Sequence, residues 1–154
     1  MSASSGAGSD RASGGGSGPR VSTPVMPSDI APPAANYVHA TLTEAPARWL
    51  HTSGVVPTSP DGSTPSEVGA QAEVVWSNIG AMLRDASMLP EHIVSVTTYV
   101  VAGQPLAAVM ATRDGFLDGH VAASTLVTVP ELAQPQWLME IAIVAAAPPI
   151  GDDG

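Results

Sequence analysis

The pattern of hydrophobic and polar residues predicts five short strands in the middle and C-terminal parts of the chain. Each is a run of β-branched, aromatic or alternating apolar residues, bounded by Gly, Pro or polar residues. The first two are expected to form a hairpin whose loop covers residues 44–48. The five predicted strands are 37–43, 49–53, 93–101, 123–129 and 137–146.

Two segments between these strands have the spacing of an amphipathic helix. The first follows Thr-Pro-Ser-Glu at 64–67, which predicts a capping box with Thr64 at the N-cap. The second runs from about Leu106 to Leu117. It carries Arg113 on its apolar side, where we expect the side chain to snorkel to the edge or to contact another subunit.

The resulting order, β-β-α-β-α-β-β, predicts an α+β two-layer domain with a mixed sheet and both helices on one face. The other face of the sheet then lacks a cover. We expect Val96, Thr98 and Val100 on that face, where they are too apolar to face water. The pattern therefore predicts an oligomer.

Both ends of the chain differ in composition from the folded domain expected over residues 32–147. Residues 1–28 are mostly Ser, Gly, Ala and Pro, which predicts a disordered tail. Residues 148–154 are expected to be a disordered acidic C-terminus. The sequence has neither a secretory signal nor about 18 consecutive apolar residues, so the expectation is a cytoplasmic protein without a membrane partner.

The charge balance limits the classes of partner. The formal net charge is −9, and all five basic residues are arginines, two of them in the tail. Three scattered cations cannot neutralise a run of phosphates, which argues against nucleic acid as a partner. The chain has no Cys, which excludes disulfides, thiolate metal sites and a cysteine nucleophile.

Glu140 is the only charged residue in the apolar run 137–147. A buried carboxylate must be paired, hydrogen-bonded or protonated. Desolvation favours the neutral form of such a group, which suits it to proton transfer near neutrality. Glu140 is therefore the first candidate for a catalytic residue. The alternative is a structural carboxylate that holds a neighbouring loop or subunit.

A series of short motifs, in this order and spacing, resembles the Rid family (also called YjgF), a group of small trimeric proteins. The resemblance covers residues from about 32 to 147. The motifs are Ala-Asn-Tyr-Val at 35–38, Leu-His-Thr-Ser-Gly at 50–54, the helix over 71–83, Val-Ser-Val-Thr-Thr-Tyr-Val at 94–100, Ala-Ser-Thr-Leu-Val at 123–127 and Leu-Met-Glu-Ile-Ala-Ile at 138–143.

The resemblance implies a chorismate-mutase-like fold, a homotrimer with a central barrel, and small-molecule pockets between subunits. It also implies hydrolysis of reactive enamines and imines to a carbonyl compound and ammonia. In such members a Tyr and a Ser line the pocket, and a Glu positions the attacking water. Tyr37, Ser53 and Glu140 stand in those places. Thr125 stands where relatives carry Cys or Thr, and its hydroxyl is a candidate to orient water.

The Arg that clamps a substrate carboxylate in such members is absent. Their Pro-Ala-Arg-Ser pattern is Val-Ala-Ala-Ser at 121–124, so Ala123 stands where the guanidinium would bind. Ala142 replaces a second acid that the family often has on the last strand. We therefore expect a neutral or cationic substrate. Arg48 and Arg113 are expected to be surface residues rather than replacements for the missing cation.

Three histidines lie close in sequence to these positions. His39 and His51 are two residues from Tyr37 and Ser53, so each pair is expected to share a strand face. We interpret both as half-buried strand residues, with a place near the pocket as the alternative. His120 precedes the strand that lost its Arg, and is a candidate proton donor or weak anion contact there. No two histidines have metal-ligand spacing, so neither a metal nor a cofactor is expected.

The sequence thus predicts a Rid-like enamine or imine hydrolase, or a related enzyme that processes a carbonyl compound or imine without a carboxylate. Tautomerisation, dehydration or cyclisation of a biosynthetic intermediate would use the same general base. The alternative is a non-catalytic or chaperone-like trimer that keeps the fold and the pocket. A ribonuclease activity fits poorly with the charge balance.

Overall fold

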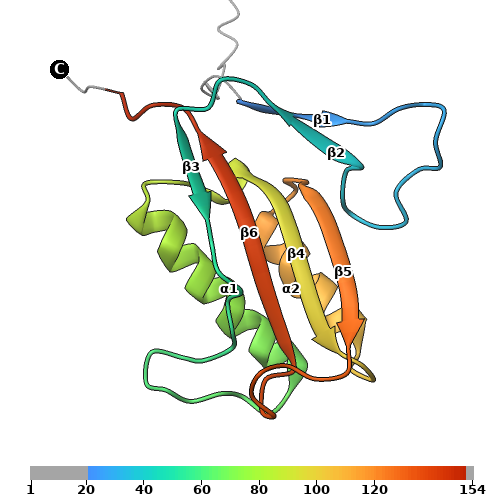
Figure 1. Cartoon of the computed structure of the whole chain (residues 1–154), viewed down its shortest axis with the longest axis vertical. Helices are drawn as coiled ribbons and strands as arrows, with labels where there is room; N and C mark the ends of the chain where they lie inside the picture. The colour runs from blue at the N-terminus through green and yellow to red at the C-terminus, as the bar shows by residue number, and fades with distance from the viewer. Residues whose placement is uncertain (1–20, 152–154) are drawn as a thin grey trace, which may run out of the picture.

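The computed structural model describes residues 21–151, which form six strands and two helices (Figure 1). The strands are β1 (Ser22–Val25), β2 (Ala40–Thr43), β3 (Arg48–His51), β4 (Ile93–Val101), β5 (Ala123–Val129) and β6 (Met139–Ala147). The helices are α1 (Val68–Asp85) and α2 (Leu106–Leu117), and a single 3-10 turn, Pro90–His92, precedes β4. The predicted bounds of β4, β5 and α2 are confirmed.

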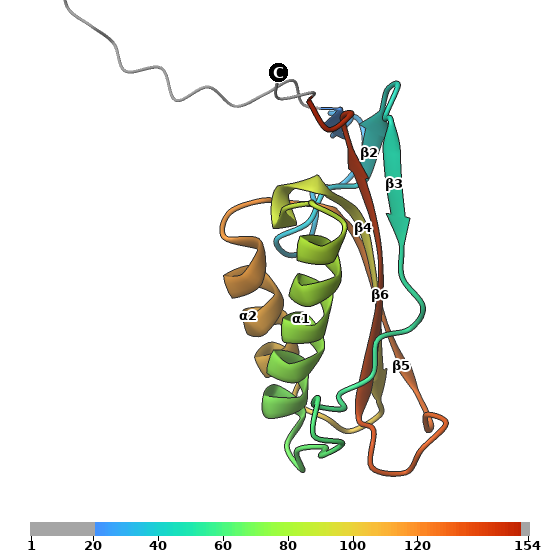
Figure 2. The same ribbon diagram turned by 90° about the vertical axis from the view of Figure 1, so that its left-hand side faces the viewer.

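Four strands form the main sheet in the order β3-β6-β4-β5. Strands β4 and β5 are parallel, whereas β6 is antiparallel to both of its neighbours. Both helices lie on the same face of this sheet, as the side view shows (Figure 2). The predicted two-layer α+β architecture with a mixed sheet is therefore confirmed. Among the described helices, none is long and apolar enough to cross a membrane.

The core lies between the helices and one face of the sheet. Alternate residues of β6, from Met139 through Ile141 to Ile143, are buried against α1. Val96 and Val100 of β4 belong to the same core, and Thr98 is also buried. Our prediction that these three β4 residues face away from the helices is wrong. Near both ends of β4, residues that point to either face of the sheet are apolar. The sequence of this strand therefore does not show which face lies against the helices.

The opposite face, which we call the open face, has no helix over it. It carries Tyr99 from β4 and Glu140 from β6, because these alternate with the core residues. Two apolar residues on it are strongly exposed, Trp49 at 50% and Val127 at 40%. The apolar character that predicted an oligomer is therefore present, but it comes from other residues than those expected.

The N-terminal segment forms a separate two-stranded ribbon. Strand β1 pairs antiparallel with β2, so the tail predicted over residues 1–28 is too long at its C-terminal end. Residues 1–20 and 152–154 lie outside the described part of the chain. Strands β2 and β3 belong to different sheets, so the predicted hairpin over 44–48 is wrong. The reason is that β2 finds its antiparallel partner in β1, upstream, instead of in β3.

The predicted capping box of the first helix is also wrong. Helix α1 begins at Val68, with Glu67 as an N-cap that makes no side-chain capping bond. Buried Gln71 joins the segment before the helix to the segment before β6. Its Nε2 donates to the carbonyl oxygens of Pro65 (2.7 Å) and Gln136 (2.8 Å), and its Oε1 accepts from the Leu138 N–H at 2.8 Å. These three bonds help to hold the helix start in place.

Two arginines predicted at the surface have structural partners. Arg48 donates to the carbonyl oxygens of Ala86 (2.7 Å), Ser87 (3.3 Å) and Pro148 (3.0 Å), and so joins the end of α1 to the end of β6. Arg113 is only 6% exposed and forms an ion pair with Asp114. The prediction that Arg113 snorkels to the edge is therefore wrong, because the side chain is buried and paired with a neighbouring carboxylate.

Candidate functional site

Glu140 lies near the start of β6 on the open face, where it is half-buried. Its cross-strand partner on β4 is Tyr99, whose ring lies on the same face. Tyr99 is not among the site residues predicted from the sequence. The signal that would have found it is the pairing register, which places Tyr99 directly opposite Glu140.

Gly54 lies against the Glu140 side chain. After β3 the chain continues along β6, with the Thr52 N–H donating to Ile143 O (3.1 Å) and the Val55 N–H donating to Ile141 O (2.7 Å). A Cβ at Gly54 would overlap the Oε1, Cδ and Cγ atoms of Glu140. The carboxylate therefore occupies space that exists only because residue 54 is glycine. Exposed Ser53 precedes it, so the predicted Ser53 and Glu140 belong to one group, the Glu140 half-site.

A second group, the Tyr37 half-site, lies where β5 begins. Val38 forms a β-bridge with Ala123, and its N–H donates to Ala122 O at 3.3 Å. This bridge brings Tyr37 close to the start of β5, where Ala123 lies, and exposed Thr125 follows two residues further along that strand. The Tyr37 hydroxyl accepts from the Ala34 N–H at 3.4 Å.

The two half-sites do not meet within one chain. Ala123 pairs with Ser95 of β4, and Glu140 pairs with Tyr99, four residues further along the same strand. Strands β5 and β6 lie on opposite sides of β4. With ordinary sheet spacings, Ala123 and Glu140 are about 16 Å apart. A small substrate held against Ala123 therefore does not reach the Glu140 carboxylate of the same subunit.

The histidines near the half-sites have other partners. His39 Nε2 lies 2.7 Å from Ala31 O, and its ring contacts Tyr37 edge-on with centroids 6.2 Å apart. The predicted shared face of His39 and Tyr37 is thus observed. His51 stacks on Trp49 with centroids 6.1 Å apart.

His120 lies in the wall of a cavity of about 450 Å³ beneath the β1–β2 ribbon. Its Nε2 donates to Ile93 O at 2.7 Å. His92 lines the same cavity, and its Nδ1 accepts from the Leu89 N–H at 3.0 Å. Burial lowers the pKa of His92, Glu91 opposes this change, and Arg48 and His120 add to it. The cavity is lined by neither Ala123 nor Glu140.

A shallow groove of about 600 Å³ runs between residues 50–58 and α1. Ser53 and His51 line this groove together with Asn78 and Met82 of the helix. Asn78 Nδ2 donates to Thr58 O at 3.0 Å and so fixes the loop that forms one wall. The groove extends from the Glu140 half-site along the edge of the sheet.

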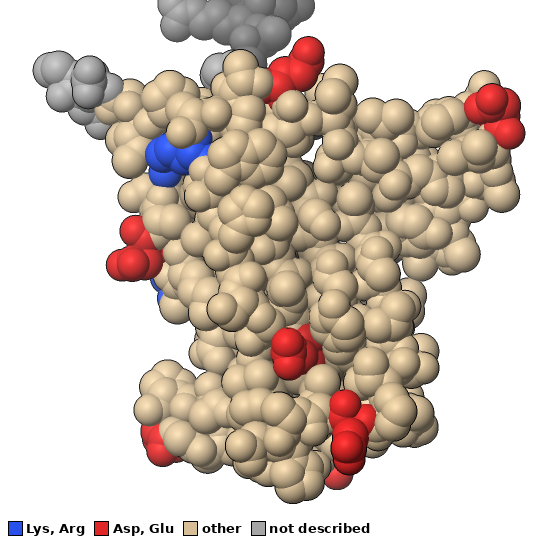
Figure 3. All heavy atoms as spheres, in the orientation of Figure 1, with Lys and Arg blue, Asp and Glu red and all other residues tan. Residues whose placement is uncertain are grey.

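The open face offers little positive charge. In the space-filling view the surface is mostly uncharged, with scattered acidic groups, and basic groups appear only towards one edge (Figure 3). Within residues 21–151, no three His, Asp or Glu side chains lie together in a way that would hold a metal ion. The arrangement can therefore supply a carboxylate and hydroxyls, but no cation that would bind a substrate carboxylate.

Comparison with known proteins identifies the family. A search of curated proteins gave no match. Among solved structures, YyfB from Yersinia pestis, a Rid-family protein of unknown function, is 30% identical, with 82% of this chain and 99% of that chain covered and a TM-score of 0.76. Yeast Mmf1 is 23% identical (82% and 98% covered, TM-score 0.60), and E. coli TdcF, solved with bound serine, is 24% identical (79% and 92% covered, TM-score 0.60).

The family model described as Endoribonuclease L-PSP matches residues 28–147, nearly the whole described part of the chain. This match confirms both the predicted family and its chorismate-mutase-like fold. The chain therefore belongs to the endoribonuclease L-PSP family, the YjgF/Rid family.

Proposed function

We propose that the protein is a homotrimeric enzyme that hydrolyses enamines or imines, or processes related carbonyl compounds, that lack a carboxylate. The observation that carries this proposal is the pair of half-sites on the open face. They are too far apart to act together in one subunit, and a neighbouring subunit packed on this face would complete each site. A barrel of three sheets provides such packing and also covers Trp49 and Val127.

Glu140 is the proposed general base. It takes a proton from a water molecule whose oxygen attacks the C=N carbon, which gives a carbinolamine. The nitrogen of this adduct receives that proton. The carboxylate then takes the proton of the new hydroxyl group and passes it to the nitrogen as well, so that the C–N bond breaks, the C=O bond forms and ammonia leaves. Tyr99 and Ser53, beside the carboxylate, are the hydroxyl groups placed to orient the water on this side of the pocket.

The absence of a cation supports the proposed substrate class. Ala123 provides no charge, Arg48 donates to three carbonyl oxygens, and the Arg113 guanidinium pairs with Asp114. A substrate carboxylate would therefore lose its hydration without gaining an ionic partner. A neutral or cationic imine avoids this loss.

The test compares two imines, each generated in the assay mixture by a second enzyme. An amino-acid oxidase supplies an imino acid, and a flavin-dependent amine oxidase supplies a neutral imine, while ammonia release is followed in real time. We expect faster release with the neutral imine and little change with the imino acid. Ordinary acceleration with the imino acid would contradict the proposed selectivity.

The Glu140→Gln variant tests the base. We expect a loss of about 100- to 10,000-fold in the rate of the neutral-imine reaction, because the amide cannot accept the proton. Circular dichroism and thermal unfolding serve as the control, and both should match the wild type. Unchanged turnover in a folded Glu140→Gln protein would assign the carboxylate a structural role.

A second candidate is a trimer that binds small molecules without turning them over. The observation that favours it is the loss of two charged groups from the family pattern, at Ala123 and Ala142. Calorimetry with a panel of small ketones and keto acids, run beside the turnover assay, separates the candidates. Binding by both wild type and Glu140→Gln, with no turnover by either, would support the second candidate.

The family name does not lead us to propose action on RNA. The described residues contain three arginines, and the guanidinium groups of Arg48 and Arg113 are bound to other parts of the chain. Binding to phosphates needs several free cations along one surface.

A further inference from the structure

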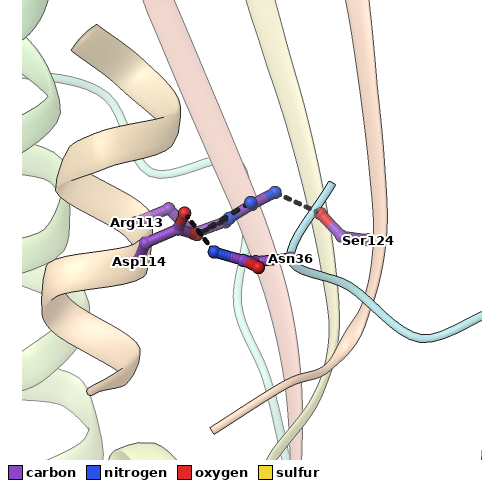
Figure 4. Close-up of polar contacts among 4 residues, drawn as sticks. All are labelled: Asn36, Arg113, Asp114 and Ser124. Atoms are coloured by element: carbon purple, nitrogen blue, oxygen red, sulfur yellow. Dashed lines mark hydrogen bonds and ion pairs between the residues drawn. The ribbon is translucent and has the colours of Figure 1, made fainter. Parts of the chain in front are cut away.

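The Arg113–Asp114 pair lies on the helix side of the sheet, with its side chains directed toward Asn36 and Ser124 (Figure 4). Arg113 Nε and Nη2 donate to Asp114 Oδ1 at 2.9 and 2.8 Å. The Arg113 side chain is almost fully buried, and Asp114 is about one-third exposed. Both residues come from the last turns of α2, so the pair is fixed to a rigid element.

Each partner also holds a segment of the half-site. Arg113 Nη1 donates to Ser124 Oγ at 3.3 Å, and Ser124 lies between Ala123 and Thr125 on β5. Asp114 Oδ2 accepts from Asn36 Nδ2 at 3.0 Å, and Asn36 directly precedes Tyr37. The carboxylate thus uses one oxygen for the guanidinium and the other for the Tyr37 segment.

The Tyr37 segment has few other contacts that fix it. Residues 26–39 form no strand or helix, and their main link to the sheet is the bridge between Val38 and Ala123. A bond from Asp114 on the other side of Tyr37 gives the segment a second fixed point. A buried charge is stabilising only when it is paired and hydrogen-bonded, and here each nitrogen of the Arg113 guanidinium and both Asp114 oxygens have a partner.

We propose that Arg113 and Asp114 are positioning residues that hold Tyr37 in register with the start of β5. They act through Asn36 on one side and Ser124 on the other, and touch no substrate themselves. This inference rests on the proposed function only in assuming that Tyr37 contributes to the pocket. The placement of the Tyr37 ring can be measured without any substrate.

The chain contains only two tyrosines, Tyr37 and Tyr99. Protein labelled with 3-fluorotyrosine should therefore give two fluorine resonances, and the Tyr37→Phe variant assigns them. In Asn36→Ala, which removes the bond to Asp114, we expect the Tyr37 resonance to shift or broaden and the Tyr99 resonance to stay in place. In Asn36→Asp the effect should be larger, because two carboxylates then face each other.

Asn78→Ala is the matched control. Its amide also donates to a loop, at Thr58 O, so the variant makes the same chemical change on another segment. The Tyr37 resonance should not move in this protein. Unchanged Tyr37 resonances in both Asn36 variants would overturn the proposal, as would an equal change in Asn78→Ala.

The neutral-imine assay on Asn36→Ala adds a functional readout. We expect a loss of kcat/KM of up to about 100-fold, the scale of misplacing a pocket group by about 1 Å. If the wild type turns over no imine, the proposed function fails while the fluorine spectra still decide the positioning role. If the Tyr37 resonance of Asn36→Ala has moved but its kcat/KM equals that of the wild type, the role of Tyr37 in the pocket is contradicted.

Discussion

Glu140 and Gly54 form a single steric unit across two neighbouring segments. The carboxylate fills the volume that any side chain at position 54 would need. Glycine is therefore required here by its lack of a Cβ, and not by its backbone freedom. A residue adjacent to the proposed base thus determines where the carboxylate lies.

The Gly54→Ala variant tests this unit. We expect the added methyl to push the carboxylate aside, which should lower turnover. The atoms that must move are the end of a flexible, half-buried side chain, so the loss in the free energy of unfolding, measured by urea unfolding, should stay below the roughly 1–3 kcal/mol of core overpacking.

Gly115→Ala is the control for Gly54→Ala. Gly115 lies in α2, and a Cβ there would meet no atom within 4 Å. Because alanine favours helix more than glycine, the variant should gain up to about 1 kcal/mol. A Gly54→Ala protein as stable and active as wild type would refute the steric argument.

At the scale of elements, the turn over Pro90–His92 connects α1 to β4 and depends on an uncharged imidazole. The Nδ1 atom of His92 can accept the Leu89 N–H only while it carries no proton. Burial lowers the pKa of His92, so the folded protein favours this neutral form.

The direction of the pH effect follows from proton linkage. Below the ordinary histidine pKa of about 6.5, the unfolded chain binds a proton at His92 more readily than the folded one. The contribution of His92 is therefore complete above that pH and is lost as the pH falls towards the lowered folded pKa. We expect thermal unfolding between pH 5 and 7.5 to show a falling Tm on acidification.

His92→Asn is the comparison for this prediction. Asparagine can accept the same N–H through Oδ1 but does not titrate in this range. The variant should lose part of the pH dependence while keeping most of the stability at pH 7.5. An identical Tm profile in both proteins would exclude His92 as a source of the effect.

The elements show how far the sequence could predict this fold. Strands β4 and β5 and helix α2 have strong local patterns with clear boundaries, and their predicted limits match those observed. The start of α1 could not be predicted, because Gln71 bonds there to residues some 65 positions away. The pairing of β2 with β1 depends on competition between possible partner strands, which no local pattern encodes.

The candidate site was predictable to a similar extent. The resemblance brought together Tyr37, Ser53 and Glu140 as family positions, but the gap between the half-sites required the strand register. Tyr99 was missed for the same reason. The partners of buried Arg113 were missed because snorkelling and ion pairing produce the same pattern along a helix.

For the whole molecule, we predict that subunits assemble through the open face. Its exposed apolar residues suit contact with other subunits more than contact with water. Val127→Asp places a charge on this face, and we expect light scattering to show a shift from trimer to monomer. Met82→Asp is the control, since Met82 is 39% exposed against 40% for Val127 but lies on α1.

Two outcomes would contradict this assembly. A wild-type monomer at micromolar concentration would exclude the proposed trimer. A trimer that survives Val127→Asp but not Met82→Asp would move the interface from the open face of the sheet to the helices.

The separation of the half-sites has a genetic consequence. In the proposed trimer each pocket contains Glu140 from one chain and the β5 residues from its neighbour, so every pocket is formed by two chains. A chain with a defective Glu140 and a chain with a defective Tyr37 half-site would each be inactive alone. A ring that contains both kinds would still hold one intact pocket of its three, so two inactive alleles would complement each other in one cell.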